Sequence, residues 1–154
     1  MIGKKSLFKK LDHVGSVVRD LDDAVKYYEE LGLGPFLPSK LAQKGITVTD
    51  RKLYGKPASD IKMKGKIANI GHLEVEVVQP VSGDTPQKKS LESKGEGLNH
   101  LAFSVDNLDE AITGMSDMGF KVISIVRFTQ GGGAAFFDTD RLGGIQFEMI
   151  QWPQ

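Results

Sequence analysis

LDHVGSVVRDLDDAVKYYEELG, residues 11–32, is the stretch that decides the fold, because it has the pattern of one strand–turn–helix unit. LDHVGSVV predicts a strand, and LDDAVKYYEELG predicts an amphipathic helix after a short turn. His13 lies inside the strand, between apolar neighbours. A single histidine inside a strand is usually structural, so the role of His13 has to be judged from the rest of the chain.

The same unit returns 87 residues later as LNHLAFSVDNLDEAITGMSDMG, residues 98–119, and it aligns without a gap. His13 is matched by His100, and Asp12 is matched in size by Asn99. The other identical pairs are Leu11 and Leu98, Val18 and Val105, Leu21 and Leu108, Asp22 and Asp109, Ala24 and Ala111, and Gly32 and Gly119. This self-similarity predicts that two halves of the chain share one local fold.

The two halves also end alike, in HLEVEVVQP (72–80) and GIQFEMIQWP (144–153), where Glu76 aligns with Glu148. The first half is 15 residues longer between its helix and its last strand, and the tract 40–66 holds the excess. Its Gly, Pro and charged residues suit a loop or a long hairpin. We therefore expect one domain over residues 1–154, with module one at about 9–81, a linker helix at about 82–96 and module two at about 97–154.

Alternation along the strands places both histidines and both glutamates on the faces that the two helices do not cover. In LNHLAFSV, for example, Leu101 and Phe103 face the helix and His100 faces away. If the two sheets join and curl, the uncovered faces line one cleft in which His13, Glu76, His100 and Glu148 meet. Their matching positions favour a shared metal site over structural histidines and solvated glutamates.

The composition limits the chemistry. The chain has no cysteine, which excludes disulfides and thiolate ligands. Imidazole and carboxylate suit a divalent ion such as Co, Mn, Ni or Zn, and they favour a six-coordinate site with two water positions over a closed tetrahedral one. Lys+Arg and Asp+Glu both number 20, which argues against nucleic acid as a partner. Without a secretory signal or a membrane span of ~20 apolar residues, we expect a cytoplasmic protein with no membrane partner.

The repeat and these four residues resemble the vicinal oxygen chelate superfamily, which includes glyoxalases and bleomycin resistance proteins. The blocks LDHVGSVVRDLDDAVKYY and GEGLNHLAFSVDNLDEAI are most similar to the methylmalonyl-CoA epimerases. The resemblance implies an α+β fold of two paired βαβββ modules, forming an incomplete barrel around a divalent metal. It also implies that His13, Glu76, His100 and Glu148 are the metal ligands.

The activity implied by the resemblance is metal-dependent proton transfer next to a carbonyl, in an isomerase that resembles acyl-CoA epimerases and forms a homodimer. The substrate would be an acyl-CoA or another small carbonyl compound. Glu148 is the first candidate acid and base. Glu74 shares the cleft face with Glu76 and is a candidate for the second acid and base, acting on the opposite face of the substrate. The alternative is that Glu74 is a solvated surface carboxylate.

Two departures from related enzymes bear on the substrate. Epimerases usually carry a glutamate in a segment like VPEQGV, whereas KLAQKGITV has Gln43 and no glutamate there. Lactoylglutathione lyase (glyoxalase I) usually carries a glutathione-binding arginine four residues after the first histidine, where this chain has Val17. The alternatives to an epimerase are a lyase similar to glyoxalase I and a binding protein of the bleomycin resistance type. Such binding proteins usually lack some of the four ligands.

Overall fold

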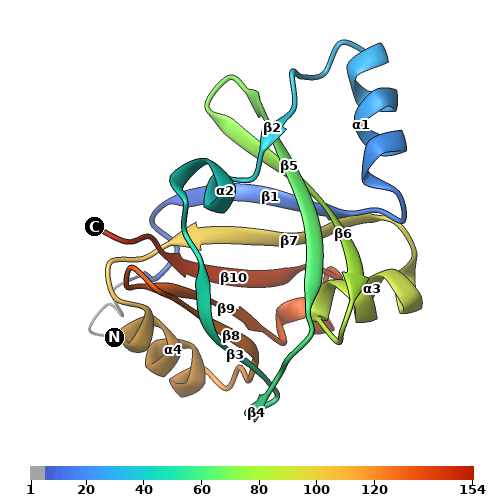
Figure 1. Cartoon of the computed structure of the whole chain (residues 1–154). Helices are drawn as coiled ribbons and strands as arrows, with labels where there is room; N and C mark the ends of the chain where they lie inside the picture. Colours follow the sequence, from blue (N-terminus) through green and yellow to red (C-terminus); the bar gives the residue numbers. More distant parts are fainter. Residues whose placement is uncertain (1–5) are drawn as a thin grey trace.

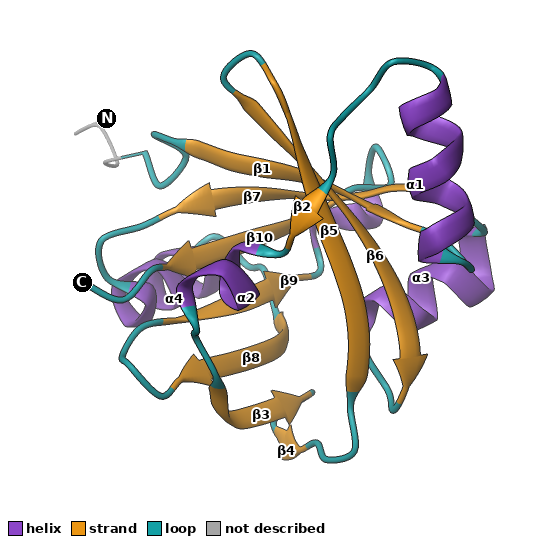
Figure 2. Cartoon of the chain, turned by 45° about the horizontal axis from the view of Figure 1, so that its top comes forward, coloured by secondary structure: helices purple, strands orange, loops and turns teal. Residues whose placement is uncertain are grey.

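The computed structural model describes residues 6–154; residues 1–5, at the start of the predicted domain, lie outside the described residues. A single curled sheet forms most of the molecule (Figures 1 and 2). Its centre is the antiparallel pair β1 (Leu11–Val17) and β7 (Gly97–Ser104), the two strands that carry the predicted histidines. The mixed sheet and its curl confirm the predicted fold class.

Each module repeats one strand order outward from this central pair. The last strand of each module lies parallel to the first: β6 (Leu73–Ser82) beside β1, and β10 (Gln146–Gln151) beside β7. Next come β5 (Lys62–Ile70) and β2 (Leu37–Pro38) on one side, and β9 (Gly133–Phe137) and β8 (Val122–Phe128) on the other. The modules therefore meet through their first strands, which brings the four predicted ligand strands together at the middle of the sheet.

The two repeated helices are α1 (Leu21–Glu30) and α4 (Leu108–Asp117). Each begins at a side chain that accepts a hydrogen bond from a backbone N–H of the first turn, Asp20 in α1 and Asn107 in α4. Leu21 and Val25 of α1 pack with Val77, and α4 packs on its own module in the same way. Both helices thus cover the outer sheet face, as the alternation predicts, and leave the inner face open.

The remaining helices are α2 (Lys40–Lys44), α3 (Pro86–Lys94) and the one-turn helix η1 (Thr139–Arg141). The α3 helix confirms the predicted linker helix, with Thr85 as its N-cap and Gly95 in a positive-φ conformation at its end. None of the helices in residues 6–154 is both long and apolar enough to span a membrane.

The additional residues of the first module form a segment that we call the strap (residues 39–58). It consists of α2 and the hairpin of β3 (Val48–Leu53) and β4 (Lys56–Pro57). The β3 strand pairs on one side with β4 of its own module and on the other side with β8, the outermost strand of the second module (Figure 1). Of the loop or hairpin that the sequence allowed in this tract, the hairpin is therefore present. It extends the sheet at the edge of the second module, and the strap connects β2, at the opposite end of the sheet, with this edge.

Candidate metal centre

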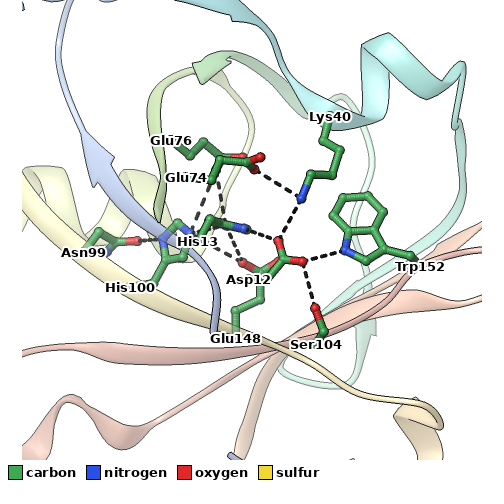
Figure 3. Close-up of polar contacts among 10 residues, drawn as sticks. All are labelled: Asp12, His13, Lys40, Glu74, Glu76, Asn99, His100, Ser104, Glu148 and Trp152. Carbon is green, nitrogen blue, oxygen red and sulfur yellow. Dashed lines mark hydrogen bonds and ion pairs between the residues drawn. The ribbon is translucent and has the colours of Figure 1, made fainter. Parts of the chain in front are cut away.

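The four residues predicted as ligands converge from four adjacent strands on the inner face of the sheet (Figure 3). The Nε2 atoms of His13 and His100 lie 3.1 Å apart. Glu148 Oε2 lies 3.4 Å from each of these nitrogens, and Glu76 Oε1 lies 3.9 Å from each. The sequence alignment of two half-chains thus identified four side chains that meet in space.

Each imidazole is oriented by the residue directly before it in the strand. Asp12 Oδ1 accepts a hydrogen bond from His13 Nδ1 at 2.8 Å, and Asn99 Oδ1 accepts one from His100 Nδ1 at 2.9 Å. With Nδ1 donating outward, the neutral ring presents the Nε2 lone pair to the centre, as a metal ligand requires. The sequence contained a signal for this pair, because Asp12 and Asn99 occupy the same position of the repeat.

A glycine leaves the space that one of these rings needs. Gly15 pairs with His100 across β1 and β7, and the imidazole lies directly over its Cα. A Cβ at Gly15 would overlap three atoms of the His100 ring. The absence of a side chain here is therefore a condition for the position of His100.

Asp12 accepts hydrogen bonds from several donors besides His13. Trp152 Nε1 and Ser104 Oγ donate to its Oδ2, each at 2.8 Å, and Lys40 Nζ lies 3.3 Å from its Oδ1. Burial by itself would raise the pKa of Asp12, but the hydrogen bonds from His13, Trp152 and Ser104 outweigh it and hold this pKa well below its usual range. Asp12 is therefore a buried carboxylate that stays ionised and fixes the first histidine.

The two histidines have opposite pKa shifts. Burial disfavours the charged form of His13, but hydrogen bonds to Asp12 and Glu148 and the nearby carboxylate charges outweigh it and raise its pKa well above the usual value. Burial lowers the pKa of His100 to about 4. Burial also raises the pKa of Glu76 to about 7. In the metal-free site, a proton is therefore favoured on His13 and disfavoured on His100.

The donor atoms fit a divalent ion in kind and in spacing. Two ligand atoms at about 2.1 Å from one ion are roughly 3.0 Å apart when they subtend a right angle and roughly 3.4 Å apart in a tetrahedron. The separations of 3.1 Å and 3.4 Å among His13, His100 and Glu148 lie in this range, whereas Glu76 Oε1, at 3.9 Å from each histidine nitrogen, lies beyond it. Two imidazole nitrogens and two carboxylates are also a donor set that first-row divalent metals accept.

Glu74 lies inside the cleft and is not a solvated surface residue. Its side chain is 13% exposed, and its Oε1 lies 3.3 Å from Lys40 Nζ. Lys40 comes from the strap, and no pattern in the sequence indicated it. Gln43, in the stretch nearest to the usual epimerase glutamate, donates to the carbonyl oxygen of Pro38 at an exposed position.

The cluster forms the floor of a cleft of about 600 Å³. The inner face of module two and the strap line it with apolar side chains, including Val48, Phe128, Phe136 and Trp152. Val17, at the position of the glyoxalase I arginine, is buried and is not among the lining residues. The cleft is therefore large enough for a small organic substrate and is mostly apolar above a polar floor.

Known proteins match this chain in sequence and in fold. A model of the Glyoxalase/Bleomycin resistance protein/Dioxygenase superfamily matches residues 12–137. An uncharacterized Bacillus subtilis protein, YqjC, is 27% identical over 147 residues, covering 92% of this chain and 91% of that protein. The mitochondrial methylmalonyl-CoA epimerase of Bos taurus is 25% identical over 117 residues, covering 75% of this chain and 57% of that enzyme.

Among solved structures, a variant of Streptomyces coelicolor methylmalonyl-CoA epimerase in complex with 2-nitronate-propionyl-CoA has a similar fold, with a TM-score of 0.66. Its sequence identity is 20%, and the match covers 96% of this chain and 99% of that one. The repeated modules, the curled sheet and the sequence match to the family agree. This chain belongs to the glyoxalase, bleomycin resistance protein and dioxygenase superfamily.

Proposed function

We propose that the protein is a metal-dependent enzyme that moves a proton at the carbon next to a carbonyl, and that it is an acyl-CoA epimerase similar to methylmalonyl-CoA epimerase. The observation that carries this proposal is the meeting of His13, His100, Glu76 and Glu148 on the cleft floor, with Glu74 close by. The bovine relative supports an acyl-CoA substrate.

In this proposal, His13, Glu76, His100 and Glu148 hold a divalent ion, with Co, Mn, Ni or Zn as the candidates. The ion supplies a positive charge that favours the enolate form of a bound carbonyl compound. Asp12 and Asn99 keep the two Nε2 atoms turned to the centre. The apolar walls exclude water from the reacting carbon, which strengthens electrostatic interactions at the floor.

Two carboxylates serve as acid and base. Glu148 is 7% exposed, and one of its carboxylate oxygens takes the proton from the α-carbon. Glu74 returns a proton to the opposite face. It comes from β6, on the other side of the central pair from β10, and the Lys40 ammonium fixes its carboxylate. Glu74, fixed by Lys40, is therefore our candidate for the second acid and base, the role that epimerases usually give to the glutamate that this chain lacks.

The test is metal analysis followed by deuterium exchange. Protein purified without chelator is examined for bound divalent metal, and the metal-loaded form is incubated in D₂O with methylmalonyl-CoA and other acyl-CoAs. We expect deuterium at the α-carbon, with a loss of about 10²-fold or more in Glu148→Gln and in Glu74→Gln. Glu110→Gln, an exposed residue at the start of α4, is the matched control.

The other outcomes distinguish the alternatives. Turnover of a hemithioacetal without exchange into acyl-CoAs would reassign the enzyme as a lyase similar to glyoxalase I. Ligand binding by a protein that takes up no metal would indicate a binding protein of the same family. Either result contradicts the proposed epimerase.

A further inference from the structure

The strap brings a positive charge into the cleft. Across the second module, one row of directly opposed residues runs from Ile150 through Ala134 and Val126 to Arg51 of β3. Opposed residues of neighbouring strands project from the same face of a sheet. Because the first three line the cleft, Arg51 projects into it as well, and it is among the lining residues.

Arg51 has no ion-pair or side-chain hydrogen-bond partner within residues 6–154. By contrast, Arg19 pairs with Glu96, and Arg127 pairs with Asp109 at 2.6 Å. Arg51 is half-buried, and burial lowers the pKa of its guanidinium from the usual value. A partly desolvated charge without a partner costs stability, so the protein keeps a cation in the cleft that contributes nothing evident to its fold.

Among the described residues, no carboxylate of the cleft floor forms an ion pair with Arg51. Glu148 lies on β10, which is separated from β3 by two intervening strands, β9 and β8. At ~4.8 Å between neighbouring strands, the two backbones are roughly 14 Å apart along the sheet. The other basic groups at this cleft differ from Arg51: Lys40 is paired with Asp12 and Glu74, and the three remaining lysines are exposed, namely Lys52, Lys62 and Lys64.

A neutral polar side chain also lines the cleft without a partner in the described part of the chain. Gln87, in the first turn of α3, is 6% exposed, and no side-chain hydrogen bond is formed by it within residues 6–154. The hairpin of the strap reaches α3, because Lys89 Nζ donates to the hydroxyl of Tyr54 at 3.2 Å. Arg51 and Gln87 thus lie on two elements that are in contact, and both can bind a polar group in the cleft.

We propose that Arg51 binds an anionic group of the substrate, a carboxylate or a phosphate, at the end remote from the reacting carbon, and thereby determines substrate specificity. The planar guanidinium matches the two oxygens of such a group. The position of the reacting carbon rests on the proposed function, but the binding of an anion by Arg51 does not. The apolar walls between Arg51 and the floor fit a short hydrocarbon chain between the two ends of the substrate.

The test uses metal-free protein and simple anions, so that it depends on neither metal nor turnover. Trp152 is the only tryptophan and lines the cleft, which makes its fluorescence a reporter of binding. Glutarate, inorganic phosphate and the uncharged diamide of glutarate are titrated into the wild-type protein, Arg51→Gln, Arg51→Lys and the control Arg19→Gln. Arg19 is an exposed arginine of the same charge that is not among the lining residues.

We expect glutarate or phosphate to bind about tenfold to hundredfold more weakly to Arg51→Gln, with Arg51→Lys intermediate and Arg19→Gln unchanged. Binding of the diamide should not depend on Arg51, and Arg51→Gln should not lower Tm.

Preference for glutarate identifies a substrate carboxylate, and preference for phosphate identifies a phosphate group. The proposal is wrong if the wild-type protein binds neither anion. It is also wrong if the wild-type protein and Arg51→Gln bind both anions with equal affinity. Anion binding in a protein that takes up no metal would refute the proposed function alone.

Discussion

At the scale of single residues, the site depends on one small difference between equivalent positions of the repeat, Asp12 in the first module and Asn99 in the second. Asp12 and Asn99 both accept a hydrogen bond from the neighbouring Nδ1, but only Asp12 is charged. The carboxylate favours a protonated His13, whereas His100, oriented by an amide and more deeply buried, is neutral. One duplicated unit thus provides two imidazoles of unequal basicity.

We expect Asp12→Ala to weaken metal binding by about 10- to 100-fold, because His13 loses the acceptor that orients it. Asp12→Asn should weaken binding less, since an amide performs the same role at Asn99. Metal affinity is measured by competition with a chromogenic chelator, with the exposed helix residue Asp22→Asn as the control. Equal affinity of Asp12→Ala and wild type would show that Asp12 does not orient a ligand.

A methyl group at Gly15 should displace the His100 ring. We expect Gly15→Ala to cost about 1–3 kcal/mol of unfolding free energy, the usual range for overpacking, and to weaken metal binding at least tenfold. Chemical denaturation and metal titration measure the two effects. In a His100→Ala background the stability cost should largely disappear, and a cost that persists there would assign the overlap to other atoms.

Metal affinity should rise with pH between about pH 6 and pH 8. Metal binding requires an ionised Glu76, whose pKa is raised to about 7, and an unprotonated His13 Nε2, whose pKa is also raised. Both groups must release protons, so each contributes up to about tenfold in affinity per pH unit below its pKa. Titrations at several pH values measure the slope, and Glu76→Gln should show a shallower one. An affinity that is constant over this range would contradict the proton release.

At the scale of elements, the strap differs from the strands that hold the ligands. The β1 strand is bonded on both sides, to β6 and β7, whereas β3 is bonded to β8 along its length and to β4 only at Lys52 and Leu53. The strap packs through Leu41, Ile46 and Val48 on a small cluster with Phe128. It therefore has fewer stabilising contacts than the centre of the sheet.

We expect backbone amides of residues 48–57 to exchange with deuterium faster than those of β1 and β7, because local opening of an edge hairpin costs less than opening the central strands. Hydrogen exchange with mass spectrometry resolves these segments. Exchange in the strap should slow when an anionic ligand binds, since Arg51 belongs to it. Protection in the strap equal to that in β1 would indicate that the strap opens only with the whole sheet.

At the scale of the molecule, the site lies where the two modules meet. The four proposed ligands come from β1, β6, β7 and β10, so one ion would connect both halves of the chain. The homodimer implied by the family resemblance and the domain boundaries remain predictions. Sedimentation in the analytical ultracentrifuge would test whether the protein is a homodimer.

Metal should stabilise the whole fold because it binds only when the two modules are assembled. At 100 times the dissociation constant, binding adds about 2.7 kcal/mol, which corresponds to a rise in Tm of about 5–10 °C for a chain of this size. Differential scanning calorimetry with and without metal measures the shift. His13→Ala should abolish it, while Asp22→Asn should retain it. A shift of equal size in His13→Ala would place the bound metal elsewhere.

The sequence by itself determined the repeat, the helix faces and four residues on one side of the sheet. Strand alternation and helix periodicity are local properties, and the duplicated pattern HxxxxV…L made the equivalent positions of His13 and His100 recognisable. The same alignment pairs Asp12 with Asn99, but only the structure shows that each of these side chains accepts a hydrogen bond from an imidazole.

Only the tertiary structure decided which residues complete the site. Lys40 and Arg51 belong to the strap, which has no counterpart in the second module, and Trp152 follows the last strand. The placement of Arg51 depends on β3 joining the edge of the other module, a long-range pairing that no periodic pattern in the sequence indicates. The duplicated pattern thus specified the candidate metal ligands, whereas the fold of an unduplicated insertion placed Lys40 and Arg51 in the cleft.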